Sequence, residues 1–546
     1  MDTAVETTIN IDYLASLKSL GLEASEYDID SKDWDSATVE ESVNRVIDSI
    51  DKSEGNYSQI LLHDNHEKID ITLKALSIII SELKDRGIEM VRVDELAGAA
   101  LSGPPAPVAT SALLAFDTKD KLVTWIVWGN TILIALTLVK YFWVFFGMAF
   151  YSFKRGLRRL FIRKMRRKDP PVFLPHLTVI IACYNEELVI ERTLQSLIDC
   201  NYPWLKIIVV NDGSKDRTAE VVSSFAAKHP SVELFNVPNG GKARALRYGI
   251  AQAHSKWLVF CDADTIFDKN ALHNFAYSTM SEKNLGAVAG KVIVGNDINF
   301  LTRAQVIEYG IAHMFFKSAQ DSFNTVTVVP GAISLWNREA LLSIGGFTPD
   351  TLAEDADATL RVIIKGKTVR YWSNVKAKTE APLTIRMHYK QRTRWQLGNM
   401  QAIYKHRDAL LNSRDGSLGI IGLPFFYVDM VAALVYPILF IFALIIMSVH
   451  VFEFEDLVPQ NVGFIISPLF TAYSLSMFVF EILLAIVVII AERKSFLSKL
   501  GLLSTIPYYV VVYRFLLSYA TLVAGLRALK GTLQGWGHLA RTASVR

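Results

Sequence analysis

Between residues 177 and 264, short apolar runs alternate with polar residues and with helical patterns. The runs are Leu177–Cys183, Lys206–Val210, Val232–Val237 and Trp257–Cys261. An apolar run of this length, bounded by polar residues, is typical of a buried parallel strand. Helical patterns follow the first three, which predicts a β-α-β-α order and an α/β domain with a mostly parallel sheet. Leu285–Val294 and a helix from Leu301 continue it.

Polar motifs stand where these strands end. They are Tyr184-Asn185-Glu186, Asp212-Gly213-Ser214, Gly241-Lys242 and Asp262-Ala263-Asp264. In an open α/β sheet the carboxyl ends of the strands form the ligand-binding edge. Paired carboxylates there suit Mg²⁺ or Mn²⁺ bound between protein and substrate phosphates, although a lone D-x-D also occurs in solvated turns. Together the motifs predict a nucleotide site.

Longer apolar runs flank this domain. They are Leu122–Phe150 before it and Leu418–Val449, Val462–Ala491 and Leu500–Leu526 after it. Each is long enough to cross a bilayer, and 51% of the 546 residues are hydrophobic, which favours a multi-pass protein of the cell (inner or plasma) membrane. Lys154–Lys168 carries nine Lys or Arg residues and no acid. Beside a spanning helix, such a cluster sets orientation and meets anionic headgroups, so we expect a lipid partner and no nucleic acid.

This orientation would place the α/β domain in the cytoplasm and the N-terminal segment outside. The charges of the next loops suit segments that cross the membrane alternately, with the acidic stretch Phe452–Asp456 outside and the basic pair Arg493-Lys494 inside. The same alternation places the C-terminus outside, although it carries Arg527, Lys530, Arg541 and Arg546. Either Leu418–Tyr427 is interfacial or re-entrant, or the last segment does not simply cross. Each apolar segment also carries a single charged residue: Lys140, Asp429, Glu481 and Arg514. Such charges should form ion pairs or face a water-filled path, except that the long side chain of Lys140 can reach the membrane surface.

The net charge of +3 does not indicate a partner by itself. The only cysteines, Cys183, Cys200 and Cys261, all lie in the α/β domain. Two of them fall in or at the end of predicted buried strands, which favours packed thiols in a reducing compartment over disulfides.

Residues 1–100 are polar, and no signal peptide is predicted at Met1. Asp30–Trp34, Ile60–Asp64, an amphipathic helix over Asp70–Asp85, a strand over Gly87–Val93 and a short helix from Asp94 follow one another. This order resembles the C-terminal third of a polysaccharide deacetylase domain. That family takes its metal from an earlier Asp and an H-x-x-x-H pair, whereas only His63 and His66 occur here. We therefore expect an inactive remnant or a piece of such a domain, in which His63 serves packing.

Six motifs occur in the order seen in glycosyltransferase family 2. Glu354-Asp355 and Gln391-Arg392-Thr393-Arg394-Trp395 complete the four strand-end motifs. The last looks like the Q-x-x-R-W of the processive, membrane-embedded members, which are the cellulose, hyaluronan, chitin and poly-N-acetylglucosamine synthases. Ala353 replaces the Thr that usually precedes the Glu-Asp pair.

The resemblance implies a GT-A catalytic domain embedded in an α-helical membrane protein. It suggests the following division: 1–100 partial deacetylase-like segment, 101–121 linker, 122–150 transmembrane helix, 151–170 basic segment, 171–385 GT-A domain, 386–417 amphipathic interfacial helices, 418–449, 462–491 and 500–526 transmembrane segments, and 527–546 tail.

The resemblance also implies inverting transfer from a UDP-sugar to the non-reducing end of a growing β-linked glycan. Asp355, with Glu354, is the candidate catalytic pair, in which Asp355 would take the acceptor proton. Asp264 and Asp262 would hold Mg²⁺ or Mn²⁺, and Asp357 should face away from the site. Trp395 would stack on the acceptor or anchor the helix at the interface, and Gly331 would approach the acceptor or simply form a turn. The expected nucleotide-sugar residues fall into three groups. Ala182, Tyr184, Glu186 and Asp212 would hold the uridine, Gln391 with Arg392 or Arg394 would contact the diphosphate, and Lys242 and Asp262 complete the set.

Several alternatives remain open at this point. A deacetylase-like segment fused to a synthase favours UDP-N-acetylglucosamine, whereas hyaluronan- or cellulose-type synthesis stays open. The rivals are a non-processive transferase acting on a lipid acceptor, a sugar deacetylase and a silent membrane scaffold. Accessory export proteins and self-association are further partners to consider.

Overall fold

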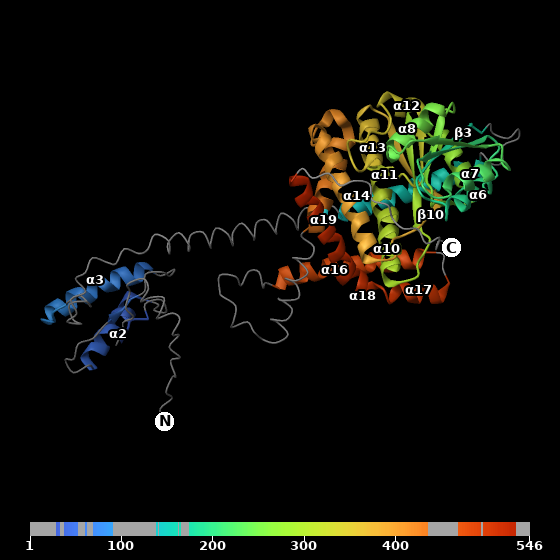
Figure 1. Ribbon diagram of the computed structural model, residues 1–546. Coiled ribbons are helices and arrows are strands. Elements are labelled where there is room, and N and C mark those ends of the chain that lie inside the picture. The colour runs from blue at the N-terminus through green and yellow to red at the C-terminus, as the bar shows by residue number, and fades with distance from the viewer. Residues whose placement is uncertain are drawn as a thin grey trace. The chain divides into compact units, whose positions relative to one another are not determined.

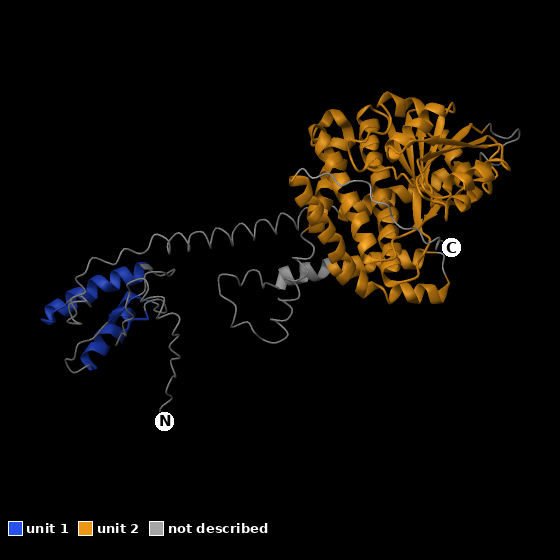
Figure 2. Ribbon diagram, in the orientation of Figure 1, with its two compact units in different colours: residues 1–126 blue, residues 127–546 orange. Residues whose placement is uncertain are grey.

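The computed structural model describes residues 29–32, 38–52, 60–62, 69–90, 138–139, 141–161, 163–164, 174–434, 468–492 and 495–530. The chain divides into two compact units, residues 1–126 and 127–546 (Figure 2).

The described residues of unit 1 form two short strands and two helices. Strand β1 (Ile29–Asp30) pairs in parallel with β2 (Ile60–Leu61), and α2 (Val39–Lys52) packs against α3 (Ile69–Asp85). Their contact is apolar because the buried side chains recur at helical spacing; they include Val43, Val46, Ile47, Ala75, Ile79 and Leu83. The helix predicted over Asp70–Asp85 is thus confirmed.

The strand predicted over Gly87–Val93 does not form over its described part. Gly87 has a φ of +71° in a turn, and residues 88–90 have no regular structure. Residues 91–93, the helix from Asp94, Asp33, Trp34, His63 and His66 lie outside the described residues. The deacetylase resemblance therefore stays a prediction.

Unit 2 is built on an eight-stranded sheet in the order β5-β4-β3-β6-β9-β8-β10-β7. The four strands predicted between residues 177 and 264 form and run parallel; they are β3 (Leu177–Cys183), β4 (Leu205–Asp212), β5 (Val232–Val237) and β6 (Trp257–Asp262). The sheet continues with β8 (Leu285–Val294) parallel to β10 (Thr368–Thr379). Antiparallel pairing is confined to β9 (Ser334–Asn337) and the edge strand β7 (Ile266–Phe267).

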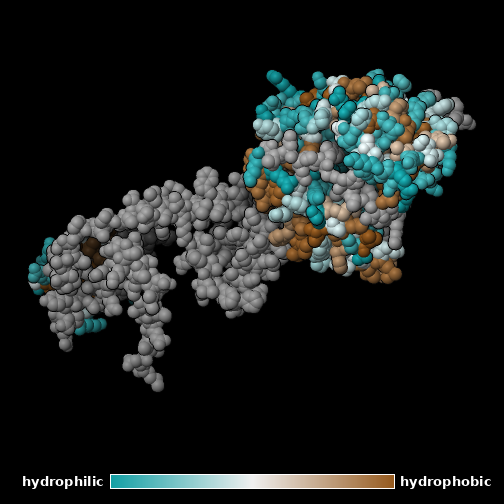
Figure 3. All heavy atoms as spheres, viewed as in Figure 1, coloured by the Kyte–Doolittle hydropathy of each residue, from teal (hydrophilic) through white to brown (hydrophobic). Residues whose placement is uncertain are grey.

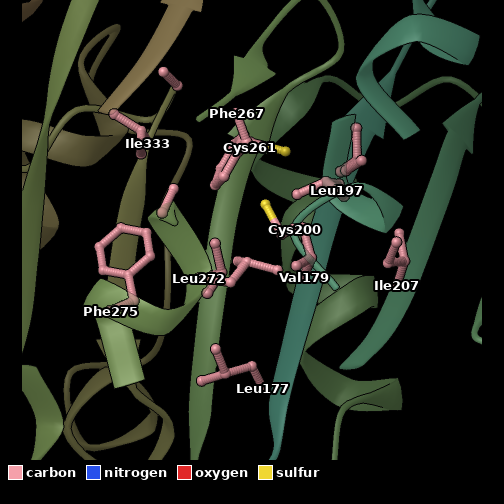
Figure 4. Packing of buried hydrophobic residues seen from close by; sticks show 14 of the residues in the cluster. Leu177, Val179, Leu197, Cys200, Ile207, Cys261, Phe267, Leu272, Phe275 and Ile333 are labelled. Carbon is pink, nitrogen blue, oxygen red and sulfur yellow. The ribbon is translucent and has the colours of Figure 1, made fainter. Parts of the chain in front are cut away.

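Helices cover both faces of this sheet. One face packs against α6 (Ile190–Ile198), α7 (Thr218–Ala226) and α9 (Ala271–Thr279), and Figure 4 shows part of this core. The other packs against α8 (Lys242–Gln252), α12 (Arg338–Ser343) and α13 (Glu354–Ile364). Alternate residues of β3 enter opposite cores, with Val179 and Ile181 on one side and Ile180 on the other, which is why consecutive residues of the strand are apolar.

A third apolar core lies among the remaining helices. The stretch Phe300–Phe323 consists of α10 (Phe300–Ile311), a π turn η1 (Ala312–Phe316) and α11 (Lys317–Phe323). It lies beside the C-terminal helices in Figure 1; these are α14 (Ile385–Lys405), α16 (Pro468–Ala491), α17 (Phe496–Leu503), α18 (Ile506–Tyr508), the π turn η7 (Tyr509–Tyr513) and α19 (Arg514–Leu529). Short turns η2 (Arg407–Ala409), η3 (Ser413–Asp415) and η4 (Leu418–Gly422) follow α14.

Within the described residues, one helical stretch, Phe496–Leu529, is long and apolar enough to cross a membrane, and Leu418–Leu434 and Phe478–Ala491 are shorter apolar helices. Figure 3 shows apolar residues gathered at the end of unit 2 that carries α16, α17 and α18 in Figure 1. Glu481 and Arg514 form an ion pair between α16 and α19, as expected of charges in apolar segments. Most of 122–150, 435–467, Arg493-Lys494 and 531–546 lie outside the described residues, so the number of crossings and their direction stay predictions.

The basic segment makes contacts that the sequence did not anticipate. Arg158 forms an ion pair of 2.9 Å with the buried carboxylate of Asp321, and the Lys154 ammonium donates to the Ser322 carbonyl at 3.2 Å. Two of the nine cations therefore fasten the helical segment 141–161 to α11. Only the rest remain for headgroups.

Candidate active site

A cavity of about 430 Å³ opens beyond the carboxyl ends of the central strands. Its walls come from β6, α8, α10, η1, the loop before β9, α13, the end of β10 and α14. Ten of the residues singled out from the sequence line it: Lys242, Asp262, Asp264, Gly331, Glu354, Asp355, Gln391, Arg392, Arg394 and Trp395. Segments more than 150 residues apart in the sequence thus converge on one cavity.

Lys242 begins α8 and bridges two carboxylates. Gly241 precedes it with a φ of +86°, a backbone angle that glycine adopts readily. The Lys242 ammonium lies 2.6 Å from Asp262 Oδ1 and 3.5 Å from Glu354 Oε1. Burial disfavours its charge, but Asp262 and Glu354 outweigh burial and raise the pKa of Lys242. A positive charge is therefore held at the carboxyl end of β6.

The two residues at the start of α13 differ in environment. Glu354 is buried, and burial raises its pKa although Lys242 opposes the shift. Asp355 Oδ2 accepts the Gly331 N–H at 3.1 Å, and its Oδ1 accepts the Ala356 N–H at 2.9 Å. A Cβ at Gly331 would lie 3.1 Å from the Lys242 ammonium, so the loop before β9 passes close to Lys242 as well as to the Asp355 carboxylate.

Asp262 and Asp264 supply carboxylate oxygens to the same cavity. The Thr379 hydroxyl lies 3.4 Å from each Asp264 oxygen, and Asp264 is buried. Among the residues that the structure describes, no group of three His, Cys, Asp or Glu side chains surrounds a metal position. Mg²⁺ and Mn²⁺ accept hard oxygens and usually use one or two carboxylates plus substrate phosphates. The Asp pair fits a cation whose other ligands come with the substrate.

Asp357 lies away from the cavity, as predicted. Its buried carboxylate accepts from Arg361 and His406 at 2.8 Å each and pairs with Lys405 at 2.9 Å. Burial alone would raise the pKa of Asp357, but the bonds from His406 and Lys405 lower it below its usual range. Asp357 therefore joins α13 to the end of α14.

The residues predicted to hold uridine are not among those that line the cavity. Both oxygens of Asp212 already accept bonds from the backbone, from Gly240 N and Gly241 N at 2.8 Å each. Asp212 thus fixes the turn that leads into Lys242. Ala182 lies near the end of β3, and Tyr184 and Glu186 follow it; all three are partly exposed, and their role in nucleotide binding remains a prediction.

Helix α14 places two arginines differently. Both line the cavity, but Arg392 is buried and forms an ion pair of 2.5 Å with Glu308, whereas Arg394 is less buried. Gln391 also lines the cavity, and its buried side-chain oxygen has no hydrogen-bond partner among the residues that the structure describes. Of the two arginines predicted to contact the diphosphate, Arg394 is the better placed.

The residues that line the cavity and that motif reasoning did not identify include Lys317, His313 and Glu308. Lys317 is buried, its ammonium donates to the Val328 carbonyl at 2.5 Å, and burial lowers its pKa to about 8. His313 stands in the π turn, and burial lowers its pKa well below the usual value. Glu308 pairs with Arg392. None belongs to a recognisable motif, although π turns inside helices frequently mark functional sites.

Comparison with known proteins agrees with this arrangement. The profile of the family described as "Glycosyltransferase like family 2" matches residues 175–398. The chain is 29% identical over 279 residues to the poly-beta-1,6-N-acetyl-D-glucosamine synthase of Staphylococcus aureus strain COL, covering 50% of this chain and 66% of that protein. It is 28% identical over 294 residues to the Staphylococcus epidermidis synthase of the same name, covering 54% and 70%.

A mannosyltransferase from Pyrobaculum calidifontis, solved with GDP-Man and Mn²⁺, aligns with 73% of this chain and 99% of its own at 18% identity and a TM-score of 0.44. That likeness is too weak to bear on the substrate. The mostly parallel sheet and the family match together agree with the predicted GT-A fold. Residues 175–398 thus match a glycosyltransferase family 2 domain, and together with the synthase relatives this match supports a hexosyltransferase.

Proposed function

We propose that the protein is a processive, inverting β-glycosyltransferase that polymerises a UDP-sugar at a membrane. UDP-N-acetylglucosamine is the proposed donor, and a growing β-linked glycan is the proposed acceptor. The observation that carries the proposal is the convergence of Lys242, Asp262 and Asp355 on one cavity with the Gln391–Trp395 motif. The similarity to two poly-N-acetylglucosamine synthases supports the choice of sugar.

In this proposal the cavity divides into a donor side and an acceptor side. Lys242 and Arg394 are cations that would neutralise the diphosphate, and Gln391 lines the same cavity. Asp262 and Asp264 would hold Mg²⁺ or Mn²⁺, which would add positive charge at the departing diphosphate. Before the donor binds, the Lys242 ammonium pairs with Asp262 at 2.6 Å.

On the acceptor side, Asp355 would accept the proton of the attacking hydroxyl. The Gly331 N–H and the Ala356 N–H orient its carboxylate, which reduces the rearrangement needed during transfer. Trp395 presents an aromatic ring on which a sugar can stack. Helices outside the family domain, among them Phe496–Leu529, would hold this site at the bilayer.

The test uses the full chain in lipid nanodiscs with a panel of UDP-sugars and Mg²⁺ or Mn²⁺. We expect UDP release with UDP-N-acetylglucosamine and radiolabelled product that elutes early from a gel-filtration column. An Asp355→Asn preparation serves as the matched background. A single sugar on extracted lipid would replace polymerisation with lipid glycosylation, and absence of UDP release with every donor would refute the proposal.

A further inference from the structure

Arg392, Glu308 and Tyr513 meet from three separate elements, and we refer to them as the Arg392 cluster. Arg392 lies on α14, Glu308 on α10, and Tyr513 is the last residue of the π turn η7. Arg392 Nη2 lies 2.5 Å from Glu308 Oε2, and the Tyr513 hydroxyl donates to the same oxygen at 2.6 Å. Arg392 Nη2 also lies 3.3 Å from the Tyr513 hydroxyl. Figure 1 shows α10, α14 and α19 side by side.

The cluster is largely shielded from water. Arg392 is 4% exposed and Tyr513 0%. A charged pair in such surroundings keeps its geometry, because moving one partner leaves the other charge buried without compensation. The guanidinium of Arg392 is therefore fixed by groups from two other helical segments.

Trp395 lies one turn further along the same face of α14. Its ring centroid is 4.4 Å from Arg392 Cζ, within the range of a cation–π contact. Trp395 lines the cavity, and so does Glu308 on the other side of the guanidinium. The position of the ring thus depends on Arg392, and the position of Arg392 depends on Glu308 and Tyr513.

We propose that Arg392 is a positioning residue that fixes the Trp395 ring for stacking of the acceptor sugar, and that Tyr513 ties this acceptor site to the candidate membrane-spanning helix. The inference rests on the proposed function, and it gives Arg392 a role distinct from diphosphate binding. Tyr513 belongs to the stretch Phe496–Leu529. A displacement of that stretch would consequently be felt at the acceptor rather than at the donor.

The test compares Tyr513→Phe with Tyr519→Phe in the full chain. Both changes remove one hydroxyl from the same helical stretch, but Tyr519 is 58% exposed and stacks on Tyr389 outside the cluster. We expect Tyr513→Phe to raise KM for a soluble β-linked N-acetylglucosamine oligosaccharide about three- to thirtyfold, the factor that corresponds to losing a cation–π contact. KM for the UDP-sugar and kcat at saturating acceptor should change by less than about twofold, and Tyr519→Phe should match the wild type.

Arg392→Lys and Arg392→Met provide the second comparison. Lysine keeps the charge beside Glu308 but lacks the flat guanidinium, so it should restore thermal stability relative to methionine without restoring the acceptor KM. If either Arg392 variant no longer shows a cooperative unfolding transition, Glu308→Gln is tested in its place. An unchanged acceptor KM, or an equal rise in donor KM, would overturn the inference. Absence of transfer by the wild type would instead refute the proposed function.

Discussion

Replacing Asp355 with Asn separates loss of a base from loss of structure. The carboxylate accepts two backbone N–H groups, Gly331 at 3.1 Å and Ala356 at 2.9 Å. The single oxygen of an asparagine amide can serve one of them, so one N–H loses its partner at a cost of about 1–3 kcal/mol. Loss of a general base lowers turnover roughly 10²–10⁴-fold, or about 3–5 kcal/mol in the barrier. The increase in the activation free energy should therefore exceed the decrease in the free energy of unfolding.

The assay measures UDP release per folded molecule, with thermal unfolding and calorimetric titration of UDP with Mn²⁺ on the same preparation. Asp355→Asn should bind UDP as the wild type does, because its bonds lie on the acceptor side. Asp264→Asn should instead weaken Mn²⁺-dependent UDP binding, since it removes a negative oxygen ligand. Turnover of Asp355→Asn within about threefold of the wild type would refute its role as base. Loss of UDP binding in Asp355→Asn but not in Asp264→Asn would show that the roles are reversed.

Two further predictions follow from shifted pKa values. The pKa of Asp357 is lowered in the folded chain, so its stabilising contribution is present above about pH 4 and is lost as pH falls below it. The unfolding temperature of Asp357→Asn should thus lie below that of the wild type at pH 7, by a difference that shrinks in acid; a constant difference would contradict this. The pKa of Lys317 is lowered to about 8 by burial, so folding should gain stability as pH rises from about 8 to 10. A plot of turnover against pH should show an inflection near pH 8 that Lys317→Met abolishes. If the inflection persists in the variant, another titrating group causes it.

The parallel half of the sheet could be predicted because local pattern and tertiary position agree there. The runs Leu177–Cys183, Lys206–Val210 and Trp257–Cys261 are apolar enough for strands covered on both faces, and each ends at a polar motif. The alternating strand Thr368–Thr379 was not recognised, because its lysines and arginine resemble a solvent-exposed loop in sequence. The short antiparallel strand Ser334–Asn337 carries no signal of its own direction.

The candidate site was predictable where it is made of motifs and unpredictable where it is made of contacts. Asp262, Glu354 and Lys242 stand in recognisable patterns, and the structure brings them together. The partners of Arg392 lie 84 and 121 residues away and belong to no motif. A buried ion pair depends on which helices pack together, and that information is spread over many apolar positions.

The buried cysteines give the chain a practical property. Cys183, Cys200 and Cys261 are the only cysteines, and all are free and buried. Burial raises the pKa of Cys183 to about 12 and that of Cys200 to about 11, so their thiols stay protonated and slow toward alkylating reagents. The natural chain is accordingly close to a cysteine-less background. Single cysteines placed along the apolar helices would be the reactive ones, and impermeant maleimides could map which loops face each side of the membrane.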